Sequence, residues 1–367
     1  MKNILVSFFL LASVSFLPVQ KKDNNTTIPS TPVAGNLFII TIDGFRWQEI
    51  FNGADSVLIS DEQFTPDADF IKMLYWGNTV SERRKKLMPF FWNVLVGKGQ
   101  LYGNRYFDNK VNTANLYSIS YPGYNEIFTG SADVHISSNS KTNNSNINIL
   151  EYLESKPAFK GKVAVFTSWD VFPYILNADR NGIVINSGYA AIKESKASLG
   201  QEMINKVQEE GIYEKKATRY DELTFLTAKE YIFKHQPRVL FLGLGETDEF
   251  AHQKRYDLYL AQANKTDRMI AELWHLVQTT PGYKDNTTFI ITTDHGRGRR
   301  AEKWTSHGEF IKGSSQTWLA VMGPGINPSG EIKEGQQIYQ QQIAQTIARL
   351  LGEEFDTDNI APAISLR

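Results

Sequence analysis

The chain has 367 residues, of which 41% are hydrophobic, and its 39 basic and 40 acidic side chains leave a net charge of -1. This length suits one large domain, or one domain with a sizeable insertion. The charge balance argues against a nucleic-acid polymer as partner, because such binders show a basic excess or stripe. The chain has no cysteine, which excludes disulfides, thiolate metal sites and a cysteine nucleophile.

The first segment has the pattern of a secretory signal. Lys2 precedes an apolar run at 4–17 that is short for a membrane span, and small and polar residues follow. We therefore expect a signal peptide at 1–20, a polar linker at 21–35 and one domain over 36–367. No lipid-anchoring cysteine follows, so we expect no stable membrane anchor, although an uncleaved N-terminal anchor is the alternative. A secreted chain without cysteine fits a bacterial periplasm.

Apolar runs of strand length alternate with segments of helical periodicity along the rest of the chain. The expected strands are 36–44, 162–168, 238–248, 287–296 and 317–325. The expected helices are 81–99, 149–155, 218–235, 255–280 and 336–352. This alternation predicts an α/β fold, a three-layer α/β/α arrangement with a mostly parallel central sheet. The periodicity is weaker at about 169–217, which we interpret as a small cap over the site.

Three of the expected strands end in an acid: Asp43, Asp248 and Asp294. Ligands of such sheets bind beyond the carboxyl ends of the strands, so these carboxylates are expected at one edge.

Three of the six histidines accompany these acids. His295 directly follows Asp294, His252 follows Asp248 by four residues, and His307 comes shortly after. If 248–252 is helical, its Asp and His share one face. Taken singly, each pair also suits a turn, a cap or a surface ion pair. Together, three Asp and three His suit two borderline divalent metals such as zinc. We interpret the other histidines as structural or surface residues: His135, His235 and His275.

The candidate nucleophile is Ser120, in the segment 115–130. Pro122 suits the first turn of a helix and Gly130 its end, so Ser120 is expected at the N-cap. It is then either a plain capping residue or a metal-activated alkoxide at a helix N-terminus.

These motifs resemble those of the alkaline phosphatase superfamily, and most closely its nucleotide pyrophosphatase/phosphodiesterase branch and bacterial relatives. The similar segments are IDGFR (42–46), SYPGYNEIFTG (120–130), DEFAH (248–252), TDHG (293–296) and SHG (306–308), in the family's order. The resemblance covers roughly residues 36 to 325.

The resemblance implies two zinc ions and a role for each matching residue. One zinc would be held by Asp248, His252 and His307. The other zinc would be held by Asp43, Asp294 and His295. Ser120 would bridge towards this second ion. Ser120 would attack phosphorus to form a phosphoseryl intermediate, which water would hydrolyse.

Two family features have no clear counterpart. The family's phosphate-contacting Asn corresponds to Asn139, Asn143 or Asn144, among which the sequence does not choose. A Lys-x-Arg pair of related monoesterases is missing from the comparable segment, 167–177. Trp169 and Phe172 of that segment could stack on a substrate ring or pack in the core.

The resemblance therefore implies a phosphodiesterase or pyrophosphatase acting on a small-molecule phosphate ester. A phosphomonoesterase on the same site is the alternative. A sulfatase, a phosphoglycerate mutase and a catalytically silent binding protein fit less well, since sulfatases have Arg where this chain has Tyr124. Of two short basic clusters, 83–86 suits solvated surface, whereas 297–300 is open to a substrate contact.

Overall fold

The computed structural model describes residues 34–211 and 217–367, and its centre is one large sheet. The strands of this sheet are β1 (Asn36–Ile42), β2 (Gly99–Tyr102), β4 (Val163–Thr167), β5 (Val184–Ser187), β6 (Val239–Leu244), β7 (Thr287–Thr292), β9 (Leu319–Met322) and β10 (Gly330–Glu331). Their order is β10-β2-β9-β7-β1-β6-β4-β5, and only the pairs that include β9 are antiparallel. The predicted mostly parallel sheet is confirmed.

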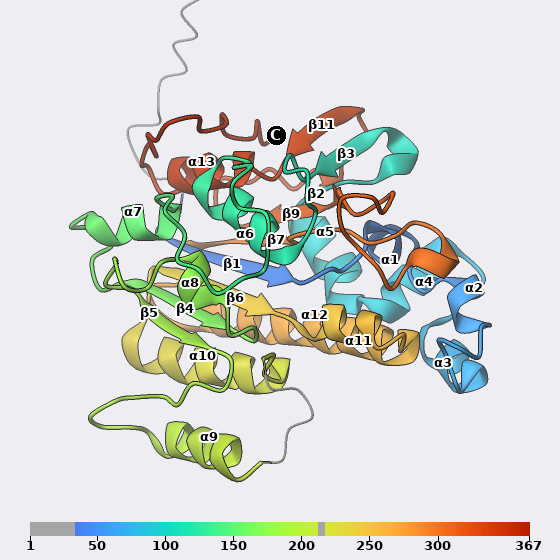
Figure 1. Cartoon of the computed structure of the whole chain (residues 1–367), viewed down its shortest axis with the longest axis horizontal. Coiled ribbons are helices and arrows are strands. Elements are labelled where there is room, and N and C mark those ends of the chain that lie inside the picture. Colours follow the sequence, from blue (N-terminus) through green and yellow to red (C-terminus); the bar gives the residue numbers. More distant parts are fainter. Residues whose placement is uncertain (1–33, 212–216) are drawn as a thin grey trace, which may run out of the picture.

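Helices cover both faces of this sheet (Figure 1). One layer contains α6 (Ser120–Thr129), α7 (Ile149–Ser155), α8 (Phe172–Ile175) and α13 (Gln342–Leu350). The other contains α1 (Trp47–Asn52), α2 (Ser56–Ile59), α3 (Ala68–Tyr75), α4 (Val80–Leu87), α10 (Asp221–His235), α11 (Glu246–His252) and α12 (Tyr256–Thr279). Strand β1 is buried throughout, and its alternate side chains enter the two apolar clusters: Phe38 and Ile40 on one face, Leu37 and Ile39 on the other. The three-layer α/β/α class is confirmed.

Two predicted helices are shorter than expected. The segment 81–99 is helical as α4, but Pro89 lacks a backbone N–H, and a π-helical turn η1 (Phe91–Leu95) and a short α5 (Val96–Lys98) follow. The predicted helix 336–352 is wrong in its first part. Residues Gln336–Tyr339 form strand β11, because they pair in parallel with β3 (Asn109–Asn112). A distant partner therefore outweighs the local helical periodicity.

A second, smaller sheet has the order β11-β3-β8, with β8 at Gln316–Thr317. The segment interpreted as a cap contains β5, an edge strand of the main sheet, and α9 (Leu199–Glu210), which packs on α10. Two 3-10 turns complete the elements, η2 (Arg105–Phe107) and η3 (Ala301–Lys303).

The expected signal peptide and nearly all of the expected linker lie outside the described residues. Among the residues described, no helix is long and apolar enough to cross a membrane.

Candidate active site

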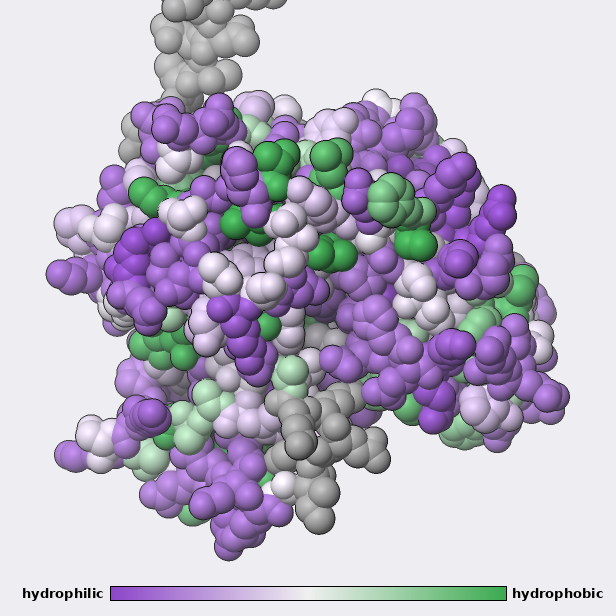
Figure 2. All heavy atoms as spheres, in the orientation of Figure 1, coloured by the Kyte–Doolittle hydropathy of each residue, from purple (hydrophilic) through white to green (hydrophobic). Residues whose placement is uncertain are grey.

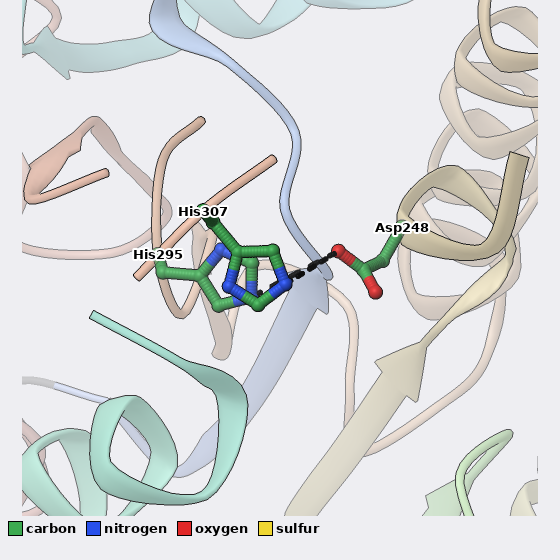
Figure 3. A group of neighbouring side chains, drawn as sticks. All are labelled: Asp248, His295 and His307. Carbon is green, nitrogen blue, oxygen red and sulfur yellow. Dashed lines mark ion pairs between the residues drawn. The ribbon is translucent and has the colours of Figure 1, made fainter. Parts of the chain in front are cut away.

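The predicted metal ligands meet at the carboxyl-end edge of the central sheet. Asp43 follows β1 directly, and Asp294 and His295 follow β7. The prediction that Asp248 ends a strand is wrong. Strand β6 ends at Leu244, and Asp248 lies on helix α11. Figure 3 shows His295 and His307, from loops on one side, facing Asp248 from the other.

The inner ligand set consists of Asp43, Asp294 and His295. His295 Nε2 lies 3.5 Å from Asp43 Oδ1 and 3.5 Å from Asp294 Oδ2, and all three residues are buried. We call the other three predicted ligands the outer ligand set: Asp248, His252 and His307. The second group of side chains that could hold an ion in the structure joins Asp248 and His307 with His295. His252 Nε2 lies 3.1 Å from Asp248 Oδ2 and 3.1 Å from His307 Nε2.

The two sets adjoin each other. His307 Nε2 lies 3.7 Å and His295 Nε2 lies 3.9 Å from Asp248 Oδ1. The two imidazole rings are stacked, with centroids 3.9 Å apart. All six predicted ligands are thus gathered into one cluster.

Backbone carbonyls orient these two imidazoles. His295 Nδ1 lies 2.9 Å from the Gly296 carbonyl oxygen, and His307 Nδ1 lies 3.3 Å from that of Ser118. A carbonyl oxygen only accepts, so Nδ1 donates and Nε2 keeps a lone pair facing the carboxylates. That tautomer is the one needed for metal binding through Nε2.

Ser120 lies beside the inner set. It is the first residue of α6, with Ile119 at the N-cap, so the prediction that Ser120 is the N-cap is wrong by one residue. The cap position makes no side-chain hydrogen bond there. The Ser120 hydroxyl instead lies 3.3 Å from His295 Nε2. Gly130 ends the helix with φ of 76°, as expected for a left-handed cap.

Burial raises the pKa values of the inner carboxyl groups. Burial, together with the charges of Asp294 and Asp248, raises the pKa of Asp43 well above its ordinary value. Burial, together with Asp248, raises the pKa of Asp294 to about 7. Asp43 Oδ1 and Asp294 Oδ2 are both buried without a hydrogen-bond partner. Unpaired buried oxygens beside an imidazole are what a divalent cation would satisfy, so these residues fit a metal.

Burial also favours the neutral form of two imidazoles, those of His295 and His307. Burial lowers the pKa of His295 to about 4, and burial with the neighbouring His295 lowers the pKa of His307 well below its ordinary value. Neutral imidazole is the ligand form.

Arg297 adjoins the outer set. The sequence analysis left a substrate contact open for the cluster 297–300 that contains it. Its side chain is buried, and its Nη2 donates to Asp248 Oδ1 at 2.7 Å. Burial would raise the pKa of Asp248, but the charge of Arg297 and the contacts of His252 and His307 hold it well below its ordinary value. Arg297 thus contacts Asp248, a predicted ligand, and it is not among the residues that line the pocket above the cluster.

Other groups support the inner set, and sequence reasoning assigned them no such role. The Tyr124 hydroxyl donates to Asp43 Oδ2 at 3.2 Å, and the Gly44 N–H donates to Asp294 Oδ1 at 3.1 Å. A Cβ on Gly123 would lie 2.5 Å from the Asp294 carbonyl oxygen, so glycine allows α6 to approach the cluster. The sequence signal that could have identified these residues is their position inside two motifs: Gly123 and Tyr124 lie in 120–130, and Gly44 lies in 42–46.

A polar pocket of about 190 Å³ lies over the cluster. Its lining residues are Asp43, Ser120, Asn139, Trp169, Thr218, Gly245, Asp248, Glu249, His252 and His307. Figure 2 shows that hydrophilic residues cover most of the face that the molecule presents in the orientation of Figure 1.

The structure separates the three candidate asparagines. Asn139 lines the pocket, and its Oδ1 accepts from the Tyr121 N–H at 2.9 Å. Asn143 instead donates to Asp179, and Asn144 is buried and donates to Asn125. Of these three, only Asn139 is at the pocket.

The two aromatic residues left open also separate. Trp169 lines the pocket, whereas Phe172 is buried in the core against Tyr124 and Phe241. The remaining histidines lie away from the cluster. His135 and His275 are exposed, and His235 pairs with Glu194.

A family model described as the Metalloenzyme superfamily matches residues 189–352, a segment that includes five of the six predicted ligands. Several solved structures share the fold. The lipoteichoic acid synthase LtaP from Listeria monocytogenes matches with a TM-score of 0.57 and 13% identity over 92% of this chain and 77% of that one. Wild type alkaline phosphatase PafA matches with a TM-score of 0.58 and 12% identity, over 91% of this chain and 98% of that one. The phosphonate monoester hydrolase SpPMH from Silicibacter pomeroyi matches with a TM-score of 0.53 and 12% identity, over 90% of this chain and 76% of that one. No curated protein sequence matches the chain significantly.

Proposed function

From the alkaline phosphatase superfamily fold of the chain and the geometry of the cluster, we propose that it is a two-metal hydrolase of phosphoric esters. One observation supports this most directly: the Ser120 hydroxyl lines the pocket and lies 3.3 Å from Nε2 of His295, a member of the inner ligand set. The inner and outer ligand sets would each hold one divalent ion, zinc by the chemistry of the donors. Such ions neutralise charge on phosphate oxygens and lower the pKa of a serine hydroxyl.

Ser120 is the nucleophile in this proposal. Its hydroxyl gives up its proton to solvent, and Oγ forms a bond to phosphorus as the bond from phosphorus to the leaving-group oxygen breaks. The leaving group takes up a proton from solvent and departs as an alcohol. Water then attacks phosphorus and the bond to Ser120 Oγ breaks. The product, a phosphate monoester when the substrate is a diester, leaves while the serine regains a proton from the attacking water. The N-terminal end of α6 favours negative charge on Ser120 Oγ during both steps.

The lining of the pocket favours diesters over monoesters. None of the described lining residues is Lys or Arg, and Glu249 adds a negative charge to the rim. A terminal phosphate brings one more negative charge than a diester, and the described lining offers no cationic side chain to neutralise it in addition to the two proposed ions. Asn139 would contact a phosphate oxygen, and Trp169 would contact the leaving group. The substrate is then a small phosphodiester or pyrophosphate.

The test compares kcat/KM for bis-p-nitrophenyl phosphate, p-nitrophenyl phosphate and p-nitrophenyl sulfate on zinc-loaded protein. We expect the diester to be preferred, and Ser120→Ala to reduce its hydrolysis by about 10³-fold or more. Ser155→Ala, an exposed serine on α7, is the matched control and should change nothing. Unchanged hydrolysis in Ser120→Ala would refute the nucleophile, and a monoester preference would refute the charge argument.

We also propose export to the periplasm, on the strength of the apolar run at 4–17. Cell fractionation with an antibody to the chain tests this, and recovery in the cytoplasm would contradict it.

A further inference from the structure

A second large cavity lies apart from the metal cluster. We call it the α1–α4 cavity, because α1 and α4 form two of its walls, and its volume is about 740 Å³. It shares no lining residue with the pocket over Ser120. Cavities of 300–1,000 Å³ are the size that binds small ligands.

The charged lining of this cavity is mainly positive. Its cations are Arg83, Arg84, Arg299 and Lys333, and its acids are Asp55 and Glu331. Both acids already have partners. Glu331 accepts from Asn104 at 2.5 Å and lies 3.5 Å from Arg84, and Asp55 accepts from the Val57 N–H at 2.9 Å. A chain of net charge -1 therefore has a local excess of positive charge here, which favours an anionic ligand.

Two of these cations are held in place before any ligand binds. The Arg83 guanidinium lies over the Trp76 ring at 4.6 Å and donates to the carbonyls of Asn52 and Gly77. The Arg84 guanidinium lies over the Trp92 ring at 3.6 Å. Arginines fixed in this way lose little side-chain entropy when they bind an anion.

The other two cations are exposed at the opening. Within the described part of the chain, neither Arg299 nor Lys333 has an ion-pair partner, and Lys333 only approaches the Phe107 ring at 5.4 Å. Arg299 also lines a smaller neighbouring cavity with Arg300, Lys303 and Lys312, and its one lining acid, Glu302, lies 3.8 Å from Arg300. The excess of positive charge therefore continues along the loop that contains His307.

Aromatic and amide groups complete the lining. The Tyr106 ring is 71% exposed and its other side packs on Trp47, with centroids 5.6 Å apart. Phe107 is 38% exposed, and the amides of Gln48 and Asn52 lie in the same wall. Exposed rings suit the C–H face of a sugar, and amides suit its hydroxyl groups.

We propose that the α1–α4 cavity is a second binding site, whose ligand is a sugar bearing phosphate or sulfate groups. Arg83, Arg299 and Lys333 contact the anionic groups, and Tyr106 stacks on the ring. A sulfated saccharide and a nucleotide share this chemistry, and both are probes in the test.

Binding is measured by calorimetry at low salt on the full chain with Ser120→Ala, so that no probe is hydrolysed and the result does not depend on the proposed reaction. The probes are a heparin disaccharide, ADP, inorganic phosphate and glucose. We expect the disaccharide or ADP to bind at least about tenfold more tightly than phosphate or glucose, and more weakly as salt rises.

Variants locate the site. Arg299→Ala with Lys333→Ala should weaken binding about tenfold or more, and Tyr106→Ala should weaken it less. The charge-matched control, Lys160→Ala with Lys206→Ala, removes two exposed lysines elsewhere and should have no effect. Three results would overturn the proposal: no binding of either probe, equal loss in the control pair, or loss on His252→Ala instead, which would place the anion at the metal cluster.

Discussion

The inner and outer ligand sets use the same donor chemistry but differ in exposure. In the inner set the side chains of Asp294 and His295 are fully buried, and that of Asp43 is 7% exposed. In the outer set the side chains are 49% exposed for His252, 16% for Asp248 and 9% for His307, and Asp248 Oδ1 also accepts from Arg297. The inner residues follow two central strands, whereas the outer ones lie on a short helix and a loop. We therefore expect the inner set to bind metal tightly and the outer set to bind it weakly and exchangeably.

The largest effect is expected from removing one ligand of each set. Asp294→Asn removes a charged inner ligand, so it should abolish inner metal binding and lower kcat/KM by about 10³-fold or more. His252→Ala removes a half-exposed outer ligand and should lower it about 10- to 100-fold, with partial recovery at high zinc. Metal content per chain, measured by mass spectrometry, accompanies the kinetics. Equal losses of kcat/KM and metal in the two variants would contradict the expected difference between the inner and outer sets.

In the metal-free protein, the free energy of unfolding should depend on pH because of the buried carboxyl group of Asp294 in the inner set. The pKa of Asp294 is about 7 in the folded chain against an ordinary 3.8. Below pH ~4 the carboxyl is protonated in both the folded and the unfolded chain. As the pH rises to about 7, the unfolded chain loses this proton while the folded chain keeps it, so the free energy of unfolding falls by a few kcal/mol at most.

Urea titrations of metal-free protein between pH 4 and 7 measure this slope. Asp267, whose pKa burial also raises to about 7, titrates in the same range, so the slope is read as the difference between the wild type and Asp294→Asn. The variant should lose part of the slope. An identical slope in both proteins would contradict the prediction.

Arg297 distinguishes the outer set from the inner one. Its charge offsets that of Asp248, so Arg297→Met should tighten metal binding at the outer set on the order of tenfold, because it removes a cation near the bound ion. Arg297→Lys keeps a charge and is the control. Competition with a chelating dye measures both affinities. A weaker outer site in Arg297→Met would mean that Arg297 mainly orients Asp248.

The smallest effect is expected from Tyr124→Phe, which removes one hydrogen bond to Asp43. Inner metal affinity should fall about tenfold or less, with outer affinity unchanged. Tyr121→Phe is a matched control, since that hydroxyl is bonded to the carbonyls of Thr142 and Tyr174 instead. A loss confined to the outer site would contradict the assignment of Tyr124 to the inner set.

Much of the fold could be predicted because the central strands are buried on both faces and are therefore apolar throughout. The strands β1, β4, β6, β7 and β9 all lie within predicted runs, and α7 has the predicted bounds. The first part of 336–352 failed because pairing with β3 is a contact across more than 200 residues, which a local period does not encode. The resemblance to the alkaline phosphatase superfamily, stated from five short motifs, implied a three-layer α/β/α fold. That fold is confirmed, and alkaline phosphatase PafA shares it.

The sequence by itself determined the class of the sheet, and it predicted six metal ligands and a serine at the start of a helix. It could do so because burial imposes composition and periodicity on each segment, and metal chemistry restricts the residue types. Only the tertiary structure decided that Asn139 and not Asn143 or Asn144 lies at the pocket, that Arg297 contacts Asp248, and that the α1–α4 cavity gathers its cations. These are contacts between segments far apart in the chain, and they depend on how the layers pack rather than on any local pattern.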